Sequence, residues 1–125
     1  MKEMIVTSLA PAAIGPYSQA VNAGNMLFVS GQLGLDPTTG MFVAGGVKEQ
    51  TAQVFRNITA ILSVAGYTVA DMVKTTVFLA DMADFAVMNE VYARQFDGSY
   101  PARSTVAVRT LPGNALVEIE VIAVK

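Results

Sequence analysis

The sequence contains no histidine, cysteine or tryptophan, and only 14% of its 125 residues are charged. Without imidazole or thiol groups the chain cannot build a serine–histidine triad, a thiolate nucleophile, or the ligand sets typical of zinc and iron–sulfur sites. The acidic residues show no calcium-loop spacing, and no glycine-rich phosphate loop is present. We therefore expect neither a metal nor a cofactor. Acid–base chemistry would have to come from carboxylates, lysine, arginine, tyrosine or bound water.

The composition also predicts the protein's cellular location and its binding partners. Hydrophobic residues make up 53% of the chain, but charged or polar residues interrupt each apolar run before the roughly 18 residues that a spanning helix needs. Residues 1–7 include an acidic residue and lack the apolar core of a signal peptide. The net charge of −2 and the absence of a Lys/Arg cluster argue against nucleic acid as a partner. We expect a soluble cytoplasmic protein, without membrane or nucleic-acid binding, that covers apolar surface by self-association.

The pattern of residues predicts one domain over residues 1–125, because no linker or repeat divides the chain. Apolar residues recur at helical spacing from Val47 to Ala65, and Gly66 supplies a stop. A second helix is expected from Asp81 or Asp84 to about Phe96. Six segments are predicted to be strands, with a hairpin turn at residues 22–25: 2–7, 17–21, 26–32, 73–79, 102–108 and 116–124.

This order of elements predicts an α+β fold, with two helices packed on one face of a mixed sheet. Both helices on one face leave the other face of the sheet without a cover. A second subunit would supply it, in agreement with the apolar composition.

Arg103 and Glu118 are the charged residues best placed for chemistry. The period of two along a strand puts Glu118 and Glu120 on one face of the last strand. Arg103 stands on another predicted strand, where its guanidinium could grip a carboxylate of a ligand or of one of these glutamates. From spacing alone we favour the second interpretation, a structural Arg–Glu ion pair across neighbouring strands.

Four other residues have both a structural and a functional interpretation. Tyr17 follows a rigid Gly-Pro turn, and Ser30 and Gly31 end an apolar strand, where the backbone can approach a ligand closely. Such residues are more often parts of a turn or a β-bulge. Asn89 lies within a helix, where a polar side chain is usually only solvated.

Several motifs together resemble one family, the reactive intermediate deaminase A family (RidA, also called YjgF). The resemblance covers nearly the whole chain. The motifs are APAAIGPYSQA (residues 10–20), VSGQ (29–32), VKTTVFL (73–79), PARST (101–105), LP (111–112) and VEIE (117–120).

The resemblance implies a chorismate-mutase-like subunit that forms a homotrimer with clefts between adjacent subunits. Similar proteins hydrolyse 2-imino acids such as 2-iminobutanoate and 2-iminopropanoate to 2-keto acids and ammonia, without metal or cofactor. They thereby protect pyridoxal-phosphate enzymes from these reactive products.

Carried onto this chain, the resemblance makes Arg103 the clamp of the substrate carboxylate and Glu118 the group that activates water. This reverses our preference for a structural ion pair. Thr105 stands where many relatives carry cysteine, so thiol chemistry cannot apply. The remaining predicted cleft residues are Tyr17, Ser30, Gly31, Asn89 and Thr105.

Other functions are weighed at the level of sequence. A chaperone, a role suggested for relatives of the family, would need exposed apolar patches, which trimer formation should bury. A regulatory trimer could bind small carboxylates in the same cleft without turnover. Ribonuclease activity, suggested for relatives of the family, fits poorly with an acidic chain that has no histidine.

Overall fold

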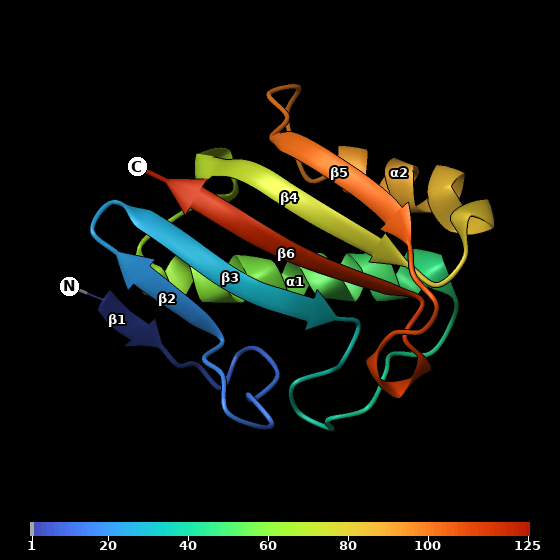
Figure 1. Ribbon diagram of the computed structural model, residues 1–125, viewed down its shortest axis with the longest axis horizontal. Helices are drawn as coiled ribbons and strands as arrows, with labels where there is room; N and C mark the ends of the chain where they lie inside the picture. Colours follow the sequence, from blue (N-terminus) through green and yellow to red (C-terminus); the bar gives the residue numbers. More distant parts are fainter. Residues whose placement is uncertain (1) are drawn as a thin grey trace.

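The computed structural model describes residues 2–125, which form a six-stranded sheet with both helices on one face (Figure 1). The strand order across the sheet is β1-β2-β3-β6-β4-β5. The predicted α+β arrangement is thereby confirmed. The strands are β1 (Lys2–Ile5), β2 (Ala20–Ala23), β3 (Met26–Leu33), β4 (Met72–Leu79), β5 (Ala102–Ala107) and β6 (Val117–Val124), and the helices are α1 (Val47–Ala65) and α2 (Phe85–Ala93). Within residues 2–125 no helix is both long and apolar enough to cross a membrane.

The last strand of the chain, β6, lies inside the sheet between β3 and β4. Neighbouring strands run antiparallel, except that β4 and β5 are parallel. Because β4 separates β5 from β6, Arg103 does not lie on a strand next to the glutamates. The neighbouring-strand ion pair that spacing alone favoured is therefore wrong.

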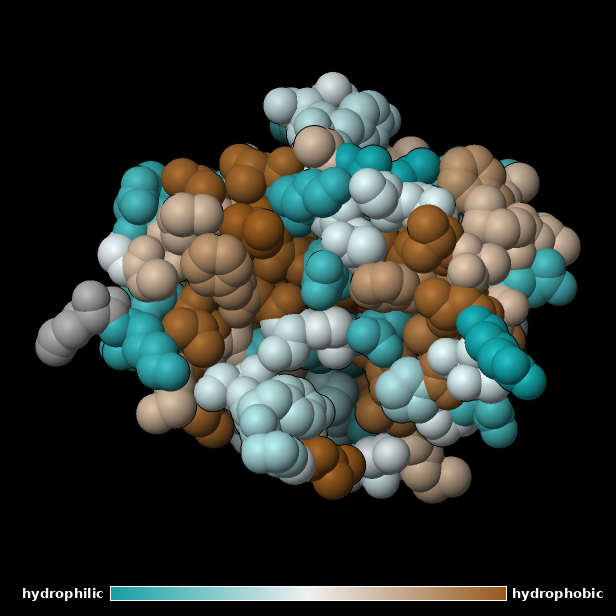
Figure 2. All heavy atoms as spheres, viewed as in Figure 1, coloured by the Kyte–Doolittle hydropathy of each residue, from teal (hydrophilic) through white to brown (hydrophobic). Residues whose placement is uncertain are grey.

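The two faces of the sheet have different environments. Alternate residues of β4 and β6 that face the helices, among them Thr75, Val77, Ile119 and Val121, are almost fully buried. The opposite face, called here the open face, carries Phe28, Val73 and Val106, which are 42%, 46% and 47% exposed. Figure 2 shows hydrophobic side chains gathered on the open face around a few polar ones. The open face is thus the uncovered sheet surface that the sequence predicted.

Helix α1 begins and ends where the sequence predicted. The Gly46 N–H donates to Glu49 Oε1 over 2.9 Å, which satisfies one of the free N–H groups at the start of the helix. Gly66 ends the helix with a φ of 85°, a left-handed conformation that glycine adopts without a steric penalty. The buried face of α1 packs on β3 and β6.

Two predicted boundaries are wrong. Residues 17–19 do not belong to β2; they form a loop, and the hairpin turn shrinks to Gly24 and Asn25. Helix α2 ends at Ala93, and the Phe96 ring beyond it packs edge-on to Phe55 at 6.1 Å between ring centroids. Aromatic packing therefore partly buries Phe96 without extending the helix.

Candidate active site

Arg103 lies between the edge strand β5 and helix α2, on the helix-bearing face of the sheet. Its NH1 donates to Asn89 Oδ1 over 2.7 Å. Its Cζ atom lies 4.7 Å from the centroid of the Tyr92 ring and 5.5 Å from that of Phe85. The cation–π contacts and the hydrogen bond to the Asn89 side chain hold the guanidinium in one orientation. Several of its N–H donors remain free.

The residues that support Arg103 share one face of α2. Phe85, Asn89 and Tyr92 are spaced four and three residues apart, so their side chains project to the same side. The Tyr92 hydroxyl hydrogen-bonds Thr75 Oγ1 over 2.7 Å and so ties the helix to β4. Burial raises the pKa of Tyr92, against smaller opposing effects of Thr75 and Arg103. Asn89 thus accepts a hydrogen bond from Arg103. From the sequence we expected its side chain to be only solvated, as is usual within a helix.

Thr105 lies two residues after Arg103 on the same face of β5. Its Oγ1 atom is buried, and within residues 2–125 it has no hydrogen-bond partner. A buried hydroxyl without a partner costs roughly 1–3 kcal/mol. Thr105 is therefore an energetically costly feature beside Arg103.

Glu118 lies on the opposite face of the sheet from Arg103, because its neighbours Val117 and Ile119 point to the helices. The half-buried side chain of Glu118 rests on Gly31. A Cβ atom at position 31 would lie only 2.8 Å from Glu118 Cδ, so the close approach requires glycine. Burial, and after it the charge of Glu120, raises the pKa of Glu118. A raised pKa makes this carboxylate a stronger base than an exposed glutamate.

Ser30 and Gly31 form a β-bulge, since β3 and β6 pair at Val29 and again only at Gln32, while β6 advances by two residues. The Ser30 hydroxyl donates to the carbonyl of Ser18 over 2.6 Å. Ser30 therefore anchors the loop that precedes β2. The structural interpretation of this pair as a bulge is confirmed.

Tyr17 sits on the loop that Ser30 anchors, and it is 53% exposed. Its hydroxyl accepts a hydrogen bond from the Ile14 N–H over 3.3 Å and keeps its own proton free to donate. Sequence reasoning missed Gln19, which is 4% exposed and binds Thr7, Ala10 and Pro11 through its amide. No motif in the sequence separates such a buried hub from a solvated glutamine.

Six of the seven predicted site residues divide between two hollows, and Thr105 lines neither. One has a volume of about 580 Å³ and is lined by Tyr17, Ser30, Gly31 and Glu118, with apolar side chains around them. The other has a volume of about 320 Å³ and contains Asn89 and Arg103 beside Tyr100. We call these the Glu118 half-site and the Arg103 half-site. Within one chain they open on different faces of the sheet.

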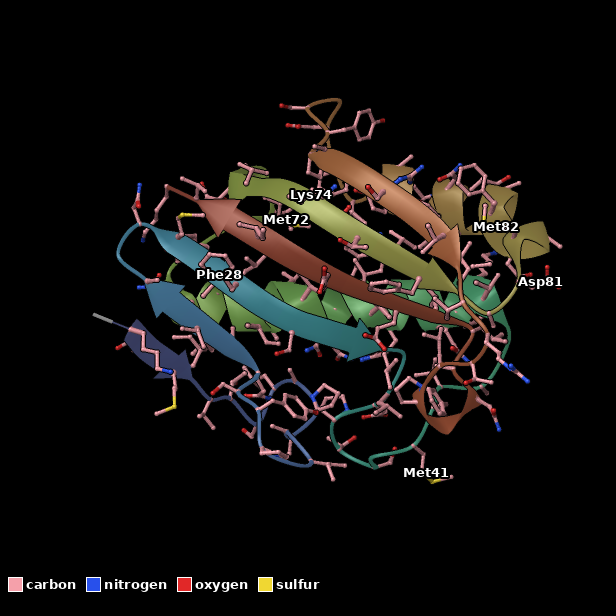
Figure 3. All side chains as sticks on the ribbon, viewed as in Figure 1. Phe28, Met41, Met72, Lys74, Asp81 and Met82 are labelled. Carbon is pink, nitrogen blue, oxygen red and sulfur yellow. The ribbon has the colours of Figure 1, made fainter. Side chains whose placement is uncertain are left out.

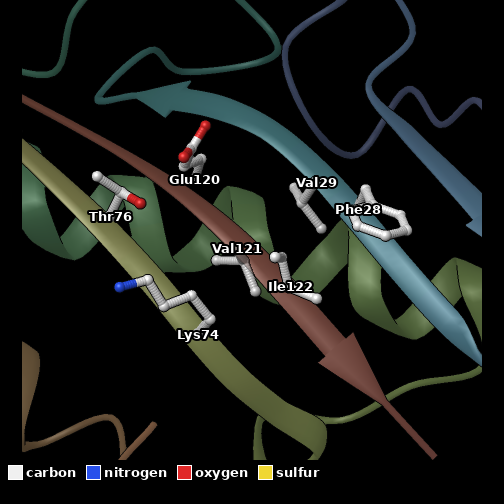
Figure 4. A pocket seen from close by; sticks show the side chains of 7 residues that line it. All are labelled: Phe28, Val29, Lys74, Thr76, Glu120, Val121 and Ile122. Carbon is white, nitrogen blue, oxygen red and sulfur yellow. The ribbon is translucent and has the colours of Figure 1, made fainter. Parts of the chain in front are cut away.

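A third hollow, of about 260 Å³, lies on the open face and contains none of the predicted site residues. Phe28 of β3 and Lys74 of β4 mark its position (Figure 3). Figure 4 shows Lys74, Thr76 and Glu120 among apolar residues of β3 and β6. The Lys74 ammonium donates to Ser104 Oγ over 3.1 Å. Among residues 2–125, no group of three or more His, Cys, Asp or Glu side chains is placed to hold a metal ion.

Comparison with known proteins gives concordant matches along the chain. A family model described as "Endoribonuclease L-PSP" matches residues 7–125. A RutC family protein of Pyrococcus horikoshii is 58% identical over 125 residues, which cover all of this chain and 99% of the relative. The 2-iminobutanoate/2-iminopropanoate deaminase of Mus musculus is 50% identical over 125 residues, covering all of this chain and 93% of the relative. Among solved structures, E. coli TdcF with bound serine superposes with a TM-score of 0.94 at 46% identity, covering 98% of each chain.

Proposed function

The chain belongs to the RidA (YjgF) family, which the matching model describes as Endoribonuclease L-PSP, and on that premise we propose that it is a 2-imino acid deaminase. The proposed reaction is hydrolysis of small 2-imino acids, such as 2-iminobutanoate and 2-iminopropanoate, to the 2-keto acid and ammonia. Its proposed site residues are Arg103 and Glu118 for the reaction, and Tyr17, Ser30, Gly31, Asn89 and Thr105 for the shape of the cleft.

The separation of the two half-sites is the observation that carries the proposal furthest. Arg103 and Glu118 point to opposite faces of one sheet, so a single chain cannot present both to one small imino acid. A complete site forms when the Arg103 half-site of one copy faces the Glu118 half-site of the next. Such a contact joins two different surfaces, and a closed ring is its ordinary outcome. We propose a homotrimer with one site at each subunit boundary.

In the proposed complex Arg103 binds the substrate carboxylate. Asn89 engages one N–H of the guanidinium, and the donors that remain can form two parallel hydrogen bonds to a carboxylate. Tyr92 and Phe85 fix the plane of the group, which fixes the position of the imine carbon next to the carboxylate. The same contacts would bind the carboxylate of the 2-keto acid product.

Glu118 is the proposed base. It accepts a proton from water as the water oxygen bonds to the carbon of the protonated imine, giving a carbinolamine. Protonated Glu118 returns that proton to the carbinolamine nitrogen, and as the C–N bond breaks and ammonia leaves, Glu118 takes the hydroxyl proton while the carbonyl forms. The protonated imine is already a strong electrophile, so a carboxylate of raised pKa suffices and histidine is not needed.

The family description names a ribonuclease, and the chemistry of this chain favours the deaminase. RNA binding draws mainly on Lys and Arg contacts to phosphate. This chain has 8 Lys and Arg against 10 Asp and Glu, and it lacks histidine. No side chain in either half-site could serve as the usual imidazole acid or base of ribonucleases.

The test adds the purified protein to a threonine dehydratase reaction and follows 2-ketobutyrate by its absorbance. We expect faster 2-ketobutyrate formation than in buffer. Arg103→Ala should remove the gain, while Arg109→Ala, an exposed arginine beyond the end of β5, should keep it. An unchanged rate with the wild-type protein would refute the proposal.

Glu118→Gln separates an enzyme from a regulatory protein that binds carboxylates without turnover. In either case the variant should still bind 2-ketobutyrate through Arg103. Only an enzyme loses most of its turnover in this variant, with a small residual rate left. The matched control is Glu90→Gln, which removes an exposed carboxylate from α2 and lies in neither half-site.

A further inference from the structure

Helix α1 carries three buried amide side chains on the face that meets the sheet. Gln50, Gln53 and Asn57 are 7%, 8% and 1% exposed, and their spacing of three and four residues places them in one row. Burying an amide is unfavourable unless its hydrogen bonds are made. The partners of these amides therefore show what the row does.

Asn57 holds the end of β3. Its Nδ2 donates to the carbonyls of Leu33 and Leu35, each over 3.0 Å. Its Oδ1 accepts from Gln53 Nε2 over 2.9 Å, which fixes the orientation of the amide. Both leucines line the Glu118 half-site, and Leu33 follows Gly31 by two residues.

Gln50 holds the start of β6. Its Oε1 accepts from the Leu116 N–H over 2.9 Å, two residues before Glu118. The backbone after β3 also rests directly on this residue, because a Cβ atom at Gly34 would lie 2.8 Å from Gln50 Cα. One turn of α1 thus contacts both chain segments whose side chains meet at Gly31 and Glu118.

The location of the amides argues for a role beyond general packing. The next turns of α1 cover the same sheet with Ile58, Ile61 and Leu62, all fully buried and apolar. Apolar contacts are non-directional and permit small sliding movements, whereas hydrogen bonds to backbone groups fix a position. The directional contacts occur at the end of the helix that lies under the Glu118 half-site.

We propose that Asn57 and Gln50 are positioning residues that set the backbone of β3 against that of β6, so that the Glu118 carboxylate rests on Gly31 in its reactive place. The inference rests on the proposed deaminase function. Displacing a catalytic group by about 1 Å can cost about 100-fold in rate. Neither amide touches the substrate in this arrangement.

The principal test is Asn57→Ala, with Asn57→Ser and Gln50→Leu as milder variants if Asn57→Ala does not remain folded at the assay temperature. We expect kcat to fall about 10- to 100-fold while KM stays within about twofold, because Arg103 and its neighbours on α2 are untouched. The matched control is Arg56→Ala. Arg56 is an exposed residue of α1 whose side chain donates a hydrogen bond to Gln53 over 3.2 Å, not to a strand. The Arg56→Ala variant should keep the wild-type kcat.

A double variant asks whether Asn57 acts through Glu118. In the Glu118→Gln background, Asn57→Ala should cause no further loss of kcat, since the group being positioned is gone. An equal fractional loss in both backgrounds would overturn the inference, as would a folded Asn57→Ala variant with unchanged kcat.

A measurement independent of turnover keeps this inference separate from the proposed function. The Gly31 amide resonance reports on the carboxylate that rests on it. We expect that resonance to shift in Asn57→Ala and to stay in place in Arg56→Ala. If the wild-type protein has no deaminase activity, the proposed function fails and the resonance still tests the positioning. If the resonance does not move in a folded variant, the positioning fails and the deaminase can stand.

Discussion

Mixing two strongly impaired variants should restore activity, because the two half-sites open on opposite faces of one sheet. Arg103→Ala removes the proposed carboxylate clamp and leaves Glu118 intact, and Glu118→Gln does the reverse. Each variant alone has one defective half in all of its sites. A ring assembled from both variants contains some boundaries where an intact Arg103 faces an intact Glu118.

The size of the recovery follows from counting boundaries. In a ring with one site per boundary, an intact site needs a Glu118→Gln copy on the Arg103 side and an Arg103→Ala copy on the other side. With random assembly at equal amounts, each condition is met half of the time, so about one quarter of the sites are intact. At a fraction f of one variant the recovery is f(1−f), which makes a parabola with its maximum at equal mixing.

The assay uses the two variants unfolded together in urea and refolded, with each variant refolded alone as the control. Ketoacid formation is then measured across mixing ratios at constant total protein. We expect a parabola that peaks near one quarter of the wild-type rate. Mixtures no more active than the separate variants would refute the reasoning that the two residues of a site come from different copies.

Three further predictions concern single residues. Because burial and Glu120 raise the pKa of Glu118 above the usual value of about 4.3, and the base acts only when ionised, kcat/KM should fall as pH drops through that raised pKa; Glu118→Gln should flatten this acidic limb of the pH profile. Gly31→Ala should lower kcat by about tenfold with little change in melting temperature, since its Cβ displaces only the flexible end of Glu118. Gln19→Leu should lower the free energy of unfolding by about 2–4 kcal/mol in urea titrations, because it removes the side-chain hydrogen bonds that hold residues 7–11 in place.

The sequence predicted the elements whose signals are local. Helix α1 follows from apolar spacing and from Gly66, and both are read within a few turns of chain. The alternation on β6 correctly separated Glu118 and Glu120 from the buried positions. The boundary of β2 was wrong because Gln19 is held in the loop by side-chain bonds to residues far back in the chain, which no local pattern records.

The relation between Arg103 and Glu118 could not be predicted from the sequence. Alternation shows that Arg103 and Thr105 share a face of their strand, but it does not say which face the helices cover. That choice depends on the parallel pairing of β5 with β4 and on the insertion of β6 into the sheet. Asn89 acquired its partner in the same way, through the packing of α2 against the edge strand.

The chain has no tryptophan and four tyrosines, which gives it an intrinsic optical probe. Tyr92 and Tyr100 line the Arg103 half-site, and Tyr17 lines the Glu118 half-site. Only Tyr67 lies away from both, with its hydroxyl bonded to Asn22. Ultraviolet fluorescence and near-ultraviolet circular dichroism therefore come mostly from rings at the two half-sites. If the protein binds a keto acid as proposed, we expect a spectroscopic change in the unlabelled wild-type protein.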